Sequence, residues 1–439
     1  MSLTNIYHRI QKYITNSLWI LSENILRLLA GFFVGVYVAR YMGPSDFGVY
    51  NYALSIITII TPLLKLGMDN ILVKEFVNNK KEVKDIAKTA IIMKGSVAFV
   101  LSTILFIGYA VAPSENALFI MIMSIGYIFQ ALEVFGFYYQ SVHQNKKITQ
   151  CKLIQLLVSS LMKLIAIYMN ATLFIFVILY VIDLLTLYLS LYIYTIFDKN
   201  SSFIAHGKFS LQIAKKLINE SWPFVLSGVA GLIYMRADQI MINNMLGEQS
   251  LGEFSAAVRL SEVVYMIPNL LLIVIFPVVT RAYQENKEKY EFIVQRLFDL
   301  MVLIAIAIIV PIAFFSKEII HILYGSNYDA SAQILKVHIF CAIFVFIGIS
   351  NSVWVINENL GRITLIRTVL AALLNVGLNL LFIPKYGAVG AAYATCFSQF
   401  MASVGFNILT APTRIWFYRQ IKSIITCGIG VFKFSTILK

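Results

Sequence analysis

The sequence predicts an all-α protein that crosses a membrane about twelve times, with its helices in two lobes of six. Three observations support this fold class: long apolar segments dominate the chain, positive charges alternate between successive loops, and one turn motif occurs twice. Hydrophobic residues make up 59% of the 439 residues and charged residues only 13%, with a mean hydropathy of +0.79. Soluble domains have about 45–50% apolar and about 25% charged residues. A large soluble core is therefore excluded.

Apolar segments of the length that crosses a bilayer recur from one end of the chain to the other. About 20 residues at 1.5 Å rise span the hydrocarbon layer. The first segment is too long for a signal peptide and carries Glu23 and Arg27, so we expect it to be retained. The expected spans are 17–40, 47–68, 89–112, 117–139, 148–169, 171–197, 221–246, 252–280, 297–315, 332–356, 363–383 and 388–410.

Lysine and arginine residues are distributed unevenly between the loops that join these spans. Of the 35, one alternating set of loops and loop edges holds 25, the other set holds three, and seven lie within spans. Cytoplasmic loops carry the excess of Lys and Arg in membrane proteins. The alternation therefore predicts that both termini are cytoplasmic, and it explains the net charge of +13 without nucleic acid.

A turn motif at residues 41–50, YMGPSDFGVY, returns at residues 245–254 as MLGEQSLGEF. Both copies follow the first helix of an expected group of six, and both place Gly at two equivalent positions, Gly43 with Gly48 and Gly247 with Gly252. Because six is an even number, both groups enter the membrane from the same side, which predicts a parallel repeat. We expect lobes at 1–205 and 206–410, followed by a basic interfacial tail at 411–439.

Motifs for catalysis, metal binding and nucleotide hydrolysis do not occur in the sequence. There is no GxxxxGK[ST] phosphate loop, and the five histidines form no HExxH pair. The four cysteines are scattered without CxxC spacing and are expected to be small buried hydrophobes. No outer loop is long enough to carry the carboxylates of a membrane glycosyltransferase. We therefore predict no metal, no cofactor and no enzymatic activity.

Five segments carry a family resemblance: ARYMGPSDFGVYNYA, LLKLGMDNILVKEF, SWPFVLSGVAGLIYMRADQIMINNMLG, LGEFSAAVRLSEVVYMIPNLLLIVIFPVV and YGAVGAAYATCFSQ. They resemble the Wzx-type O-antigen flippases, in the polysaccharide-export branch of the superfamily that also contains the multidrug (MATE) exporters. The resemblance covers about residues 15 to 410. It implies two six-helix lobes around a central cavity. The implied cargo is an undecaprenyl-pyrophosphate-linked oligosaccharide, moved by alternating access to the periplasmic leaflet of a bacterial inner membrane.

Ionisable residues within the expected spans identify candidate site residues, because such groups normally face a partner or a watery cavity. Counting from the nearest membrane face places Glu23 level with Lys65, and Glu23 also shares a helix face with Arg27. Matching depths predict further pairs: Asp238 with Arg259, Arg236 with Glu262, Lys94 with Glu133, and Asp183 with Lys163.

Five acids against seven bases leave two cations over, Lys336 near the outer face and either Arg27 or Lys65 deep in the membrane. A pyrophosphate could serve as the partner of such a deep cation, because its oxygens accept charge-assisted hydrogen bonds. The candidate pyrophosphate-binding residues are Arg27, Lys65, Arg236 and Arg259. Glu23, Asp238 and Glu262 are the candidate charge partners or proton carriers. Structural pairing of all these charges remains the alternative role.

Two other functions stay open on the sequence alone. A MATE-like exporter of small cations would need a cavity rich in acids, whereas bases outnumber acids here. An integral-membrane glycosyltransferase or ligase would need external carboxylates. We expect membrane lipids and other polysaccharide-assembly proteins as partners, and no nucleic acid.

The charge pattern makes a testable prediction about topology. Reporter fusions after residues 44, 114, 248, 324 and 386 should report a periplasmic location, because these loops carry few positive charges. Fusions after residues 80, 146, 208, 287, 359 and 420 should report cytoplasm, measured by paired phosphatase and fluorescence activities. Two or more reversed sites would refute the twelve-span topology.

Overall fold

The computed structural model describes the backbone of residues 3–198 and 201–436. Side chains are described for Arg27 and from Leu29 onward, except at residues 199–200, 203, 205 and 433–439. All regular elements in these ranges are helices, with no strand among the described residues. The predicted all-α class is confirmed.

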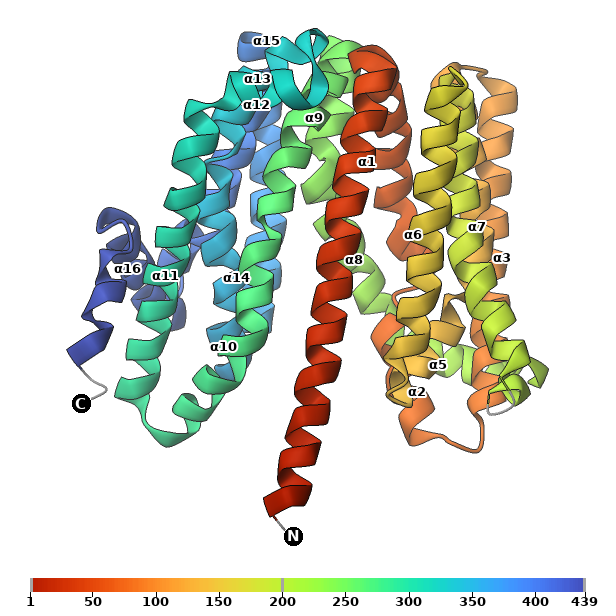
Figure 1. Ribbon diagram of the computed structural model, residues 1–439, viewed down its shortest axis with the longest axis horizontal. Helices are drawn as coiled ribbons and strands as arrows, with labels where there is room; N and C mark the ends of the chain where they lie inside the picture. Colours follow the sequence, from red (N-terminus) through yellow and green to blue (C-terminus); the bar gives the residue numbers. More distant parts are fainter. Residues whose placement is uncertain (1–2, 199–200, 437–439) are drawn as a thin grey trace. The chain divides into compact units, whose positions relative to one another are not determined.

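Long α-helices, shorter α-helices and five 3₁₀ turns make up the described chain (Figure 1). The α-helices are α1 (Leu3–Lys65), α2 (Asp69–Asn78), α3 (Val83–Val111), α4 (Glu115–Gln130), α5 (Val134–Ser141), α6 (Asn145–Tyr168), α7 (Leu173–Phe197), α8 (Leu211–Leu246), α9 (Glu248–Val264), α10 (Met266–Glu285), α11 (Lys287–Phe314), α12 (Ser316–Tyr324), α13 (Asp329–His338), α14 (Cys341–Asn357), α15 (Gly361–Ser403) and α16 (Ala411–Ile425). The 3₁₀ turns are η1 (Ala131–Glu133), η2 (Ser202–His206), η3 (Ser326–Tyr328), η4 (Gly405–Ile408) and η5 (Ile429–Thr436).

Apolar stretches long enough to cross a membrane agree with the expected spans. Among the described residues there are 9 such helical stretches, or up to 10 when the pair around the 49° bend between His338 and Cys341 counts as one. Two long helices, α1 and α15, each contain two expected spans and a non-helical glycine between them, Gly43 in α1 and Gly387 in α15. Counting each as two spans gives about twelve. The protein is a multi-pass membrane protein.

The chain forms two compact units whose boundaries do not follow the sequence order strictly. Unit 1 contains the residues up to Tyr41 and Ile56–Val229, and unit 2 contains Met42–Ser55 and Ala230–Lys439. Unit 2 therefore includes the first copy of the repeated turn, while the first half of α8 belongs to unit 1. The predicted lobes at 1–205 and 206–410 therefore remain a prediction.

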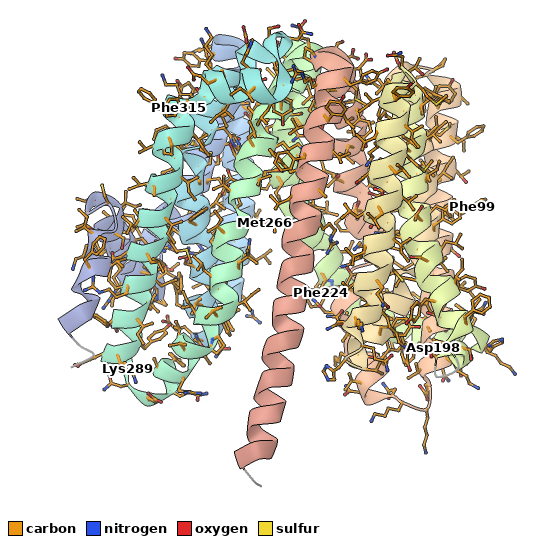
Figure 2. The ribbon with its side chains drawn as sticks, viewed as in Figure 1. Phe99, Asp198, Phe224, Met266, Lys289 and Phe315 are labelled. Atoms are coloured by element: carbon orange, nitrogen blue, oxygen red, sulfur yellow. The ribbon has the colours of Figure 1, made fainter. Side chains whose placement is uncertain are left out.

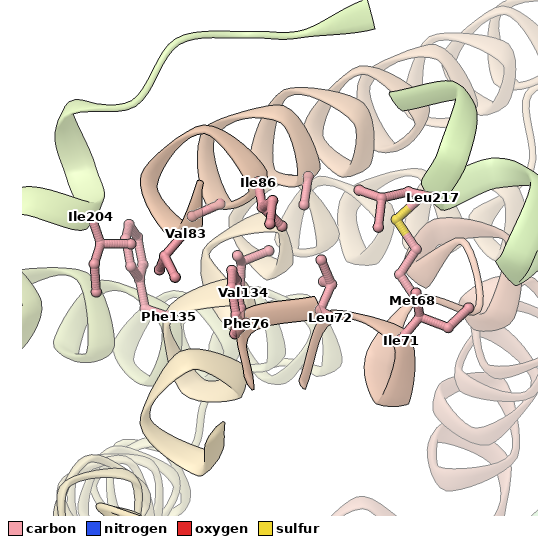
Figure 3. Packing of buried hydrophobic residues seen from close by; sticks show 12 residues of the cluster. Met68, Ile71, Leu72, Phe76, Val83, Ile86, Val134, Phe135, Ile204 and Leu217 are labelled. Atoms are coloured by element: carbon pink, nitrogen blue, oxygen red, sulfur yellow. The ribbon is translucent and has the colours of Figure 1, made fainter. Parts of the chain in front are cut away.

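Unit 1 is built on α3, α4, α6 and α7, in which α3 packs on α4, α4 on α7, and α7 on α6. Below this bundle in Figure 1, the short helices α2 and α5 pack on each other. Their apolar side chains form a core with α3, η2 and α8, which Figure 3 shows converging from these elements: Met68, Ile71, Leu72, Phe76, Val83, Ile86, Val134, Phe135, Ile204 and Leu217.

The outer faces of the helices are apolar as well. Phe99 of α3 is 64% exposed and Phe315 is 50% exposed, and Figure 2 shows both side chains pointing away from their helices. Exposed aromatic and aliphatic side chains of this kind suit contact with lipid rather than water. The exposure pattern therefore agrees with the membrane class that the composition predicts.

Unit 2 packs α9 on α13, α13 and α14 on α15, and α10, α14 and α16 on α11. The C-terminal helix α16 docks by one face, where the Trp416 ring stacks on Trp354 with centroids 5.6 Å apart and Arg419 pairs with Glu291. Tyr418 and Ile425 on α16 are exposed. An exposed apolar face next to Lys422 is what the predicted interfacial tail requires, and that prediction stays open.

The two copies of the repeated turn contact each other reciprocally within unit 2. A methyl group on the Cα of Gly48 would lie 1.8 Å from the carbonyl oxygen of Glu248, and one on Gly252 would lie 1.8 Å from that of Pro44. The two glycines of this contact are 204 residues apart, and so are the two residues that provide the carbonyl groups. This is the same offset that separates the two copies of the motif in the sequence. Only glycine permits backbones to approach so closely.

The first glycine of each copy is needed for a different reason. Gly43 has φ 74° and ψ 170°, and Gly247 has φ 90° and ψ 178°. This backbone region is essentially restricted to glycine. The motif thus combines a glycine that turns the chain with a second glycine, five residues later, that admits the carbonyl of the other copy.

Replacing the second glycine tests the reciprocal contact. Gly48→Ala and Gly252→Ala should each destabilise the folded protein by about 1–3 kcal/mol, because the added methyl forces the two backbones apart. Thermal unfolding of the purified protein, followed by size-exclusion chromatography, would measure the loss. Gly231→Ala is the matched control, since nothing lies within 4 Å of the added methyl and alanine favours a helix. Equal stability of all three variants would contradict the contact.

Candidate functional site

Unit 1 gathers two lysines and two carboxylates where α1 ends. Lys65 Nζ lies 3.2 Å from Glu133 Oε1 and 3.3 Å from Asp69 Oδ2, and Lys94 Nζ lies 3.4 Å from Asp69 Oδ1. Lys94 is only 1% exposed, and its ammonium also lies 4.8 Å from the centre of the Phe137 ring. The formal charges of the two lysines and the two carboxylates balance, and buried charges are normally paired in this way. We call these residues the Lys65 cluster.

The Lys65 cluster corrects one predicted pair. Lys94 pairs with Asp69 instead of Glu133, and Glu133 pairs with Lys65. Lys65 has two described partners: Asp69 follows it by four residues at the start of α2, and η1 brings Glu133 to it. The match between Glu23 and Lys65 stays a prediction. The side chain of Glu23 lies outside the described residues. Arg27 is half-buried on α1.

One carboxylate oxygen of the Lys65 cluster is left over. Among the described residues, Glu133 Oε2 is buried and has no hydrogen-bond partner. Glu133 also lines a pocket of about 310 Å³ together with Gln140, Thr149 and Tyr188. An unpaired buried oxygen is costly, so this side of the cluster has unused capacity to accept a proton or a hydrogen bond.

In unit 2, one predicted ion pair is confirmed beneath the second copy of the turn. Arg236 Nη1 lies 3.6 Å from Glu262 Oε1, with both side chains partly exposed. Residues 236 and 262 stand on α8 and α9, on either side of the turn at Gly247. Depth matching worked here because a tight turn fixes the register of the two helices it joins.

Asp238 contradicts the other predicted pair. Its carboxylate accepts hydrogen bonds from the backbone N–H of Gln239 at 2.8 Å and from the hydroxyl of Thr395 at 3.4 Å, in place of an ion pair with Arg259. Asn375 donates to the same hydroxyl, and Asn379 donates to Asn375 at 3.0 Å. These side chains link α8 with both halves of α15, as expected for hydrogen bonds between membrane helices.

Arg259 lies in a different part of unit 2, near α12. Burial raises the pKa of Tyr324 to about 12, and the positive charge of Arg259 partly offsets this rise. Arg259 itself is half-buried. Similarly, Asp183 on α7 accepts a hydrogen bond from Gln155 at 3.1 Å rather than pairing with Lys163. The prediction considered only charged partners, so it could not identify neutral hydrogen-bond donors such as Gln155 and Thr395.

Candidate metal-binding groups are lacking among the described residues, where no three His, Cys, Asp or Glu side chains come together. Each unit therefore holds candidate cations at intermediate burial beside carboxylates, Lys65 with Asp69 and Glu133 in unit 1 and Arg236 with Glu262 in unit 2. Such an arrangement can bind anionic oxygens and can exchange one partner for another.

Residues 13–283 match the family of polysaccharide biosynthesis proteins. The chain belongs to this family. A second family, that of the MatE transporters, matches residues 223–381.

Two relatives of this polysaccharide biosynthesis protein carry informative names. A probable low-salt glycan biosynthesis flippase, Agl15 of Haloferax volcanii, is 27% identical over 52% of this chain, and the match spans half of that relative. The capsular polysaccharide biosynthesis protein CapF of Staphylococcus aureus is 21% identical over 91% of this chain and 97% of its own length.

Solved structures show the same fold at low identity. The lipid II flippase MurJ, in an inward closed conformation, aligns with a TM-score of 0.72 at 15% identity, covering 95% of this chain and 93% of MurJ. An inward-facing multidrug resistance MATE transporter also gives 0.72, at 14% identity, covering 91% and 96%. The predicted MATE-like fold of this polysaccharide biosynthesis protein is confirmed.

The Lys65 cluster predicts a coupling between Asp69 and Lys94. Asp69→Ala should destabilise the folded protein by about 3–5 kcal/mol and so lower its yield, because it removes the carboxylate that pairs with the buried Lys94. Adding Lys94→Met should recover part of the loss, as expected of neighbouring residues. Fluorescence-detected size exclusion would report the folded amount. Lys74→Ala is the control, because Lys74 forms an exposed pair with Glu220, and purely additive losses would refute the coupling.

Proposed function

We propose that this protein is a flippase that moves undecaprenyl-pyrophosphate-linked units of O-antigen or a related surface polysaccharide across the membrane by alternating access. The observation that carries the proposal is the family match over residues 13–283, together with a relative named as a glycan biosynthesis flippase. The MurJ-like and MATE-like fold supports a transporter. No enzymatic step is needed, and we propose a non-catalytic role.

Four cations are proposed to bind the pyrophosphate: Arg27 and Lys65 in unit 1, and Arg236 and Arg259 in unit 2. Cations within membrane spans are expensive and usually serve transport. Lys65 and Arg236 both have carboxylate partners that a pyrophosphate could replace. The guanidinium groups would bind the pyrophosphate oxygens bidentately.

The acids Glu23, Asp238 and Glu262 are proposed as charge partners or proton carriers for the transport cycle. Glu262 would receive Arg236 back when the pyrophosphate leaves. Asp238 is suited to hold a proton, because its hydrogen-bond partners are a backbone N–H and a hydroxyl rather than a base. A neutral carboxylic acid fits such a buried site at a lower desolvation cost than a carboxylate.

We propose that the protein resides in the bacterial inner membrane with both termini in the cytoplasm, as the distribution of Lys and Arg predicts. The proposed partners are the lipid-linked oligosaccharide, membrane lipids and other proteins of polysaccharide assembly. A MATE-like small-molecule exporter is the second candidate, because residues 223–381 match the MatE family.

Gene deletion separates the two functions. A strain without the gene should lose surface polysaccharide and accumulate lipid-linked oligosaccharide on the cytoplasmic leaflet, and a plasmid copy should restore both. The measurements are surface glycan staining and extraction of lipid-linked oligosaccharide from oriented membranes. Normal surface glycan combined with increased drug sensitivity would favour the exporter instead.

Arg27 provides the sharpest residue-level prediction. Arg27→Ala should reduce surface glycan about tenfold or more at normal protein level, because one charge-assisted contact is worth about 1.5–3 kcal/mol. Arg27→Lys should keep partial function, since it retains the charge but loses the bidentate geometry. Arg362→Ala, at an exposed arginine, is the matched control and should behave as wild type.

A purely structural role for Arg27 gives the opposite pattern. Arg27→Ala would then deplete the protein, and Glu23→Gln would partly rescue it by removing an unpaired acid. Full glycan export by Arg27→Ala at normal protein level would falsify the binding role.

A further inference from the structure

An aromatic groove runs along an exposed side of unit 2. It is formed by α14 and the two halves of α15 and has a volume of about 710 Å³. Six aromatic rings line it, and several contact one another, with centroids 5.3 Å apart for Phe344 and Phe400 and 6.0 Å apart for Phe382 and Tyr386. Ligand sites in proteins commonly occupy about 300–1,000 Å³ and are mostly apolar and aromatic.

A second hollow of about 570 Å³ continues this groove, because Tyr393 and Cys396 line both. Here the lining changes character: α13 contributes Gln333 and Lys336. Lys336 is exposed, and no acid within the described residues forms an ion pair with it. We call the two hollows together the α15 groove; it is apolar along most of its length and cationic at one end.

The length of the α15 groove follows from the helix that lines it. From Val389, beside the cationic end, to Phe400 at the apolar end is a rise of roughly 16 Å at 1.5 Å per residue. Val389 lies two residues beyond the bend at Gly387, which the charge pattern predicts to be periplasmic. The groove would therefore extend from the outer membrane surface into the hydrocarbon layer.

Exposed apolar side chains by themselves indicate only contact with lipid, as on α3. The α15 groove differs in being hollow and in placing one unpaired lysine at the end of one apolar channel. That pattern is complementary to an anionic headgroup carried by a single long chain. A diacyl phospholipid instead brings two chains with each phosphate.

We propose that the α15 groove binds the polyprenyl chain of the translocated cargo, with its phosphate at Lys336. The inference rests on the proposed function and adds a place for the lipid part of the cargo. Aromatic rings pack against the branched chain, and the Lys336 ammonium provides a charge-assisted contact to the phosphate. A site on the outer side of unit 2 would hold the carrier lipid after flipping, before it diffuses into the outer leaflet.

Cys396 offers a direct probe, because it lines both hollows. Cys151 and Cys341 are buried, and the exposed Cys427 can be replaced by serine. The purified Cys427→Ser protein in detergent would first be reduced, because Cys341 Sγ lies 3.0 Å from Cys396 Sγ. After removal of the reductant under inert gas, it would be alkylated with N-ethylmaleimide. Mass spectrometry would give the alkylation rate of Cys396 with added undecaprenyl phosphate or with phosphatidylglycerol.

Undecaprenyl phosphate should slow alkylation of Cys396, and phosphatidylglycerol at equal mole fraction should not. Lys336→Gln should raise the lipid concentration needed for protection by about tenfold, since a charge-assisted contact contributes at that scale. Lys317→Gln, at an exposed lysine on α12, is the matched control and should leave protection unchanged.

Each other outcome overturns the proposal. Equal protection by both lipids would make the α15 groove a general lipid surface, and no protection would exclude a polyprenyl site. Unchanged protection in Lys336→Gln would remove the headgroup assignment. The readout does not depend on transport: protection without glycan export in cells would refute the proposed function alone, and export without protection would refute the groove alone.

Discussion

The close approach of two glycines to two carbonyl groups is the constraint on which the arrangement of unit 2 depends. Gly48 admits the carbonyl of Glu248, and Gly252 admits that of Pro44. This contact draws Met42–Ser55 into unit 2, although the chain before and after it belongs to unit 1. Ser55 adds a hydrogen bond to Gln239 at the far end of the same segment. The repeated sequence motif therefore encodes a contact between its own two copies, which explains why both carry the same pair of glycines.

Much of the fold could be predicted because each signal was local. Span length, loop charge and a turn built on Gly43 or Gly247 can be read from a few adjacent residues. The reciprocal contact of Gly48 and Gly252 could not, since the sequence shows that both positions are glycine but not that they face each other. The sequence also did not reveal that Gly387 forms a bend within one continuous helix, although the expected spans on both sides of it agree with α15.

The charged residues were predicted less well because depth in the membrane is only one coordinate of three. Arg236 and Glu262 were paired correctly across a tight turn that supplies the missing coordinates. Lys94 pairs with Asp69, which lies in an expected loop, and Asp238 accepts a hydrogen bond from Thr395, which carries no charge. These exchanges place the positive charge of Lys65 beside two acids and leave Asp238 among neutral donors. A transporter of a pyrophosphate needs cations whose partners can be replaced, and it needs acids that can stay neutral when buried.

Transbilayer movement of the lipid-linked glycan by the purified protein tests the central claim most directly. Proteoliposomes would contain a fluorescent undecaprenyl-pyrophosphate oligosaccharide in both leaflets, and an impermeant quencher would report the fraction that reaches the outer leaflet over time. The account predicts that quenching proceeds from the outer-leaflet fraction to completion in proteoliposomes but stops at that fraction in empty liposomes. Identical quenching in both, from vesicles in which the same protein preparation moves a small organic cation, would contradict it.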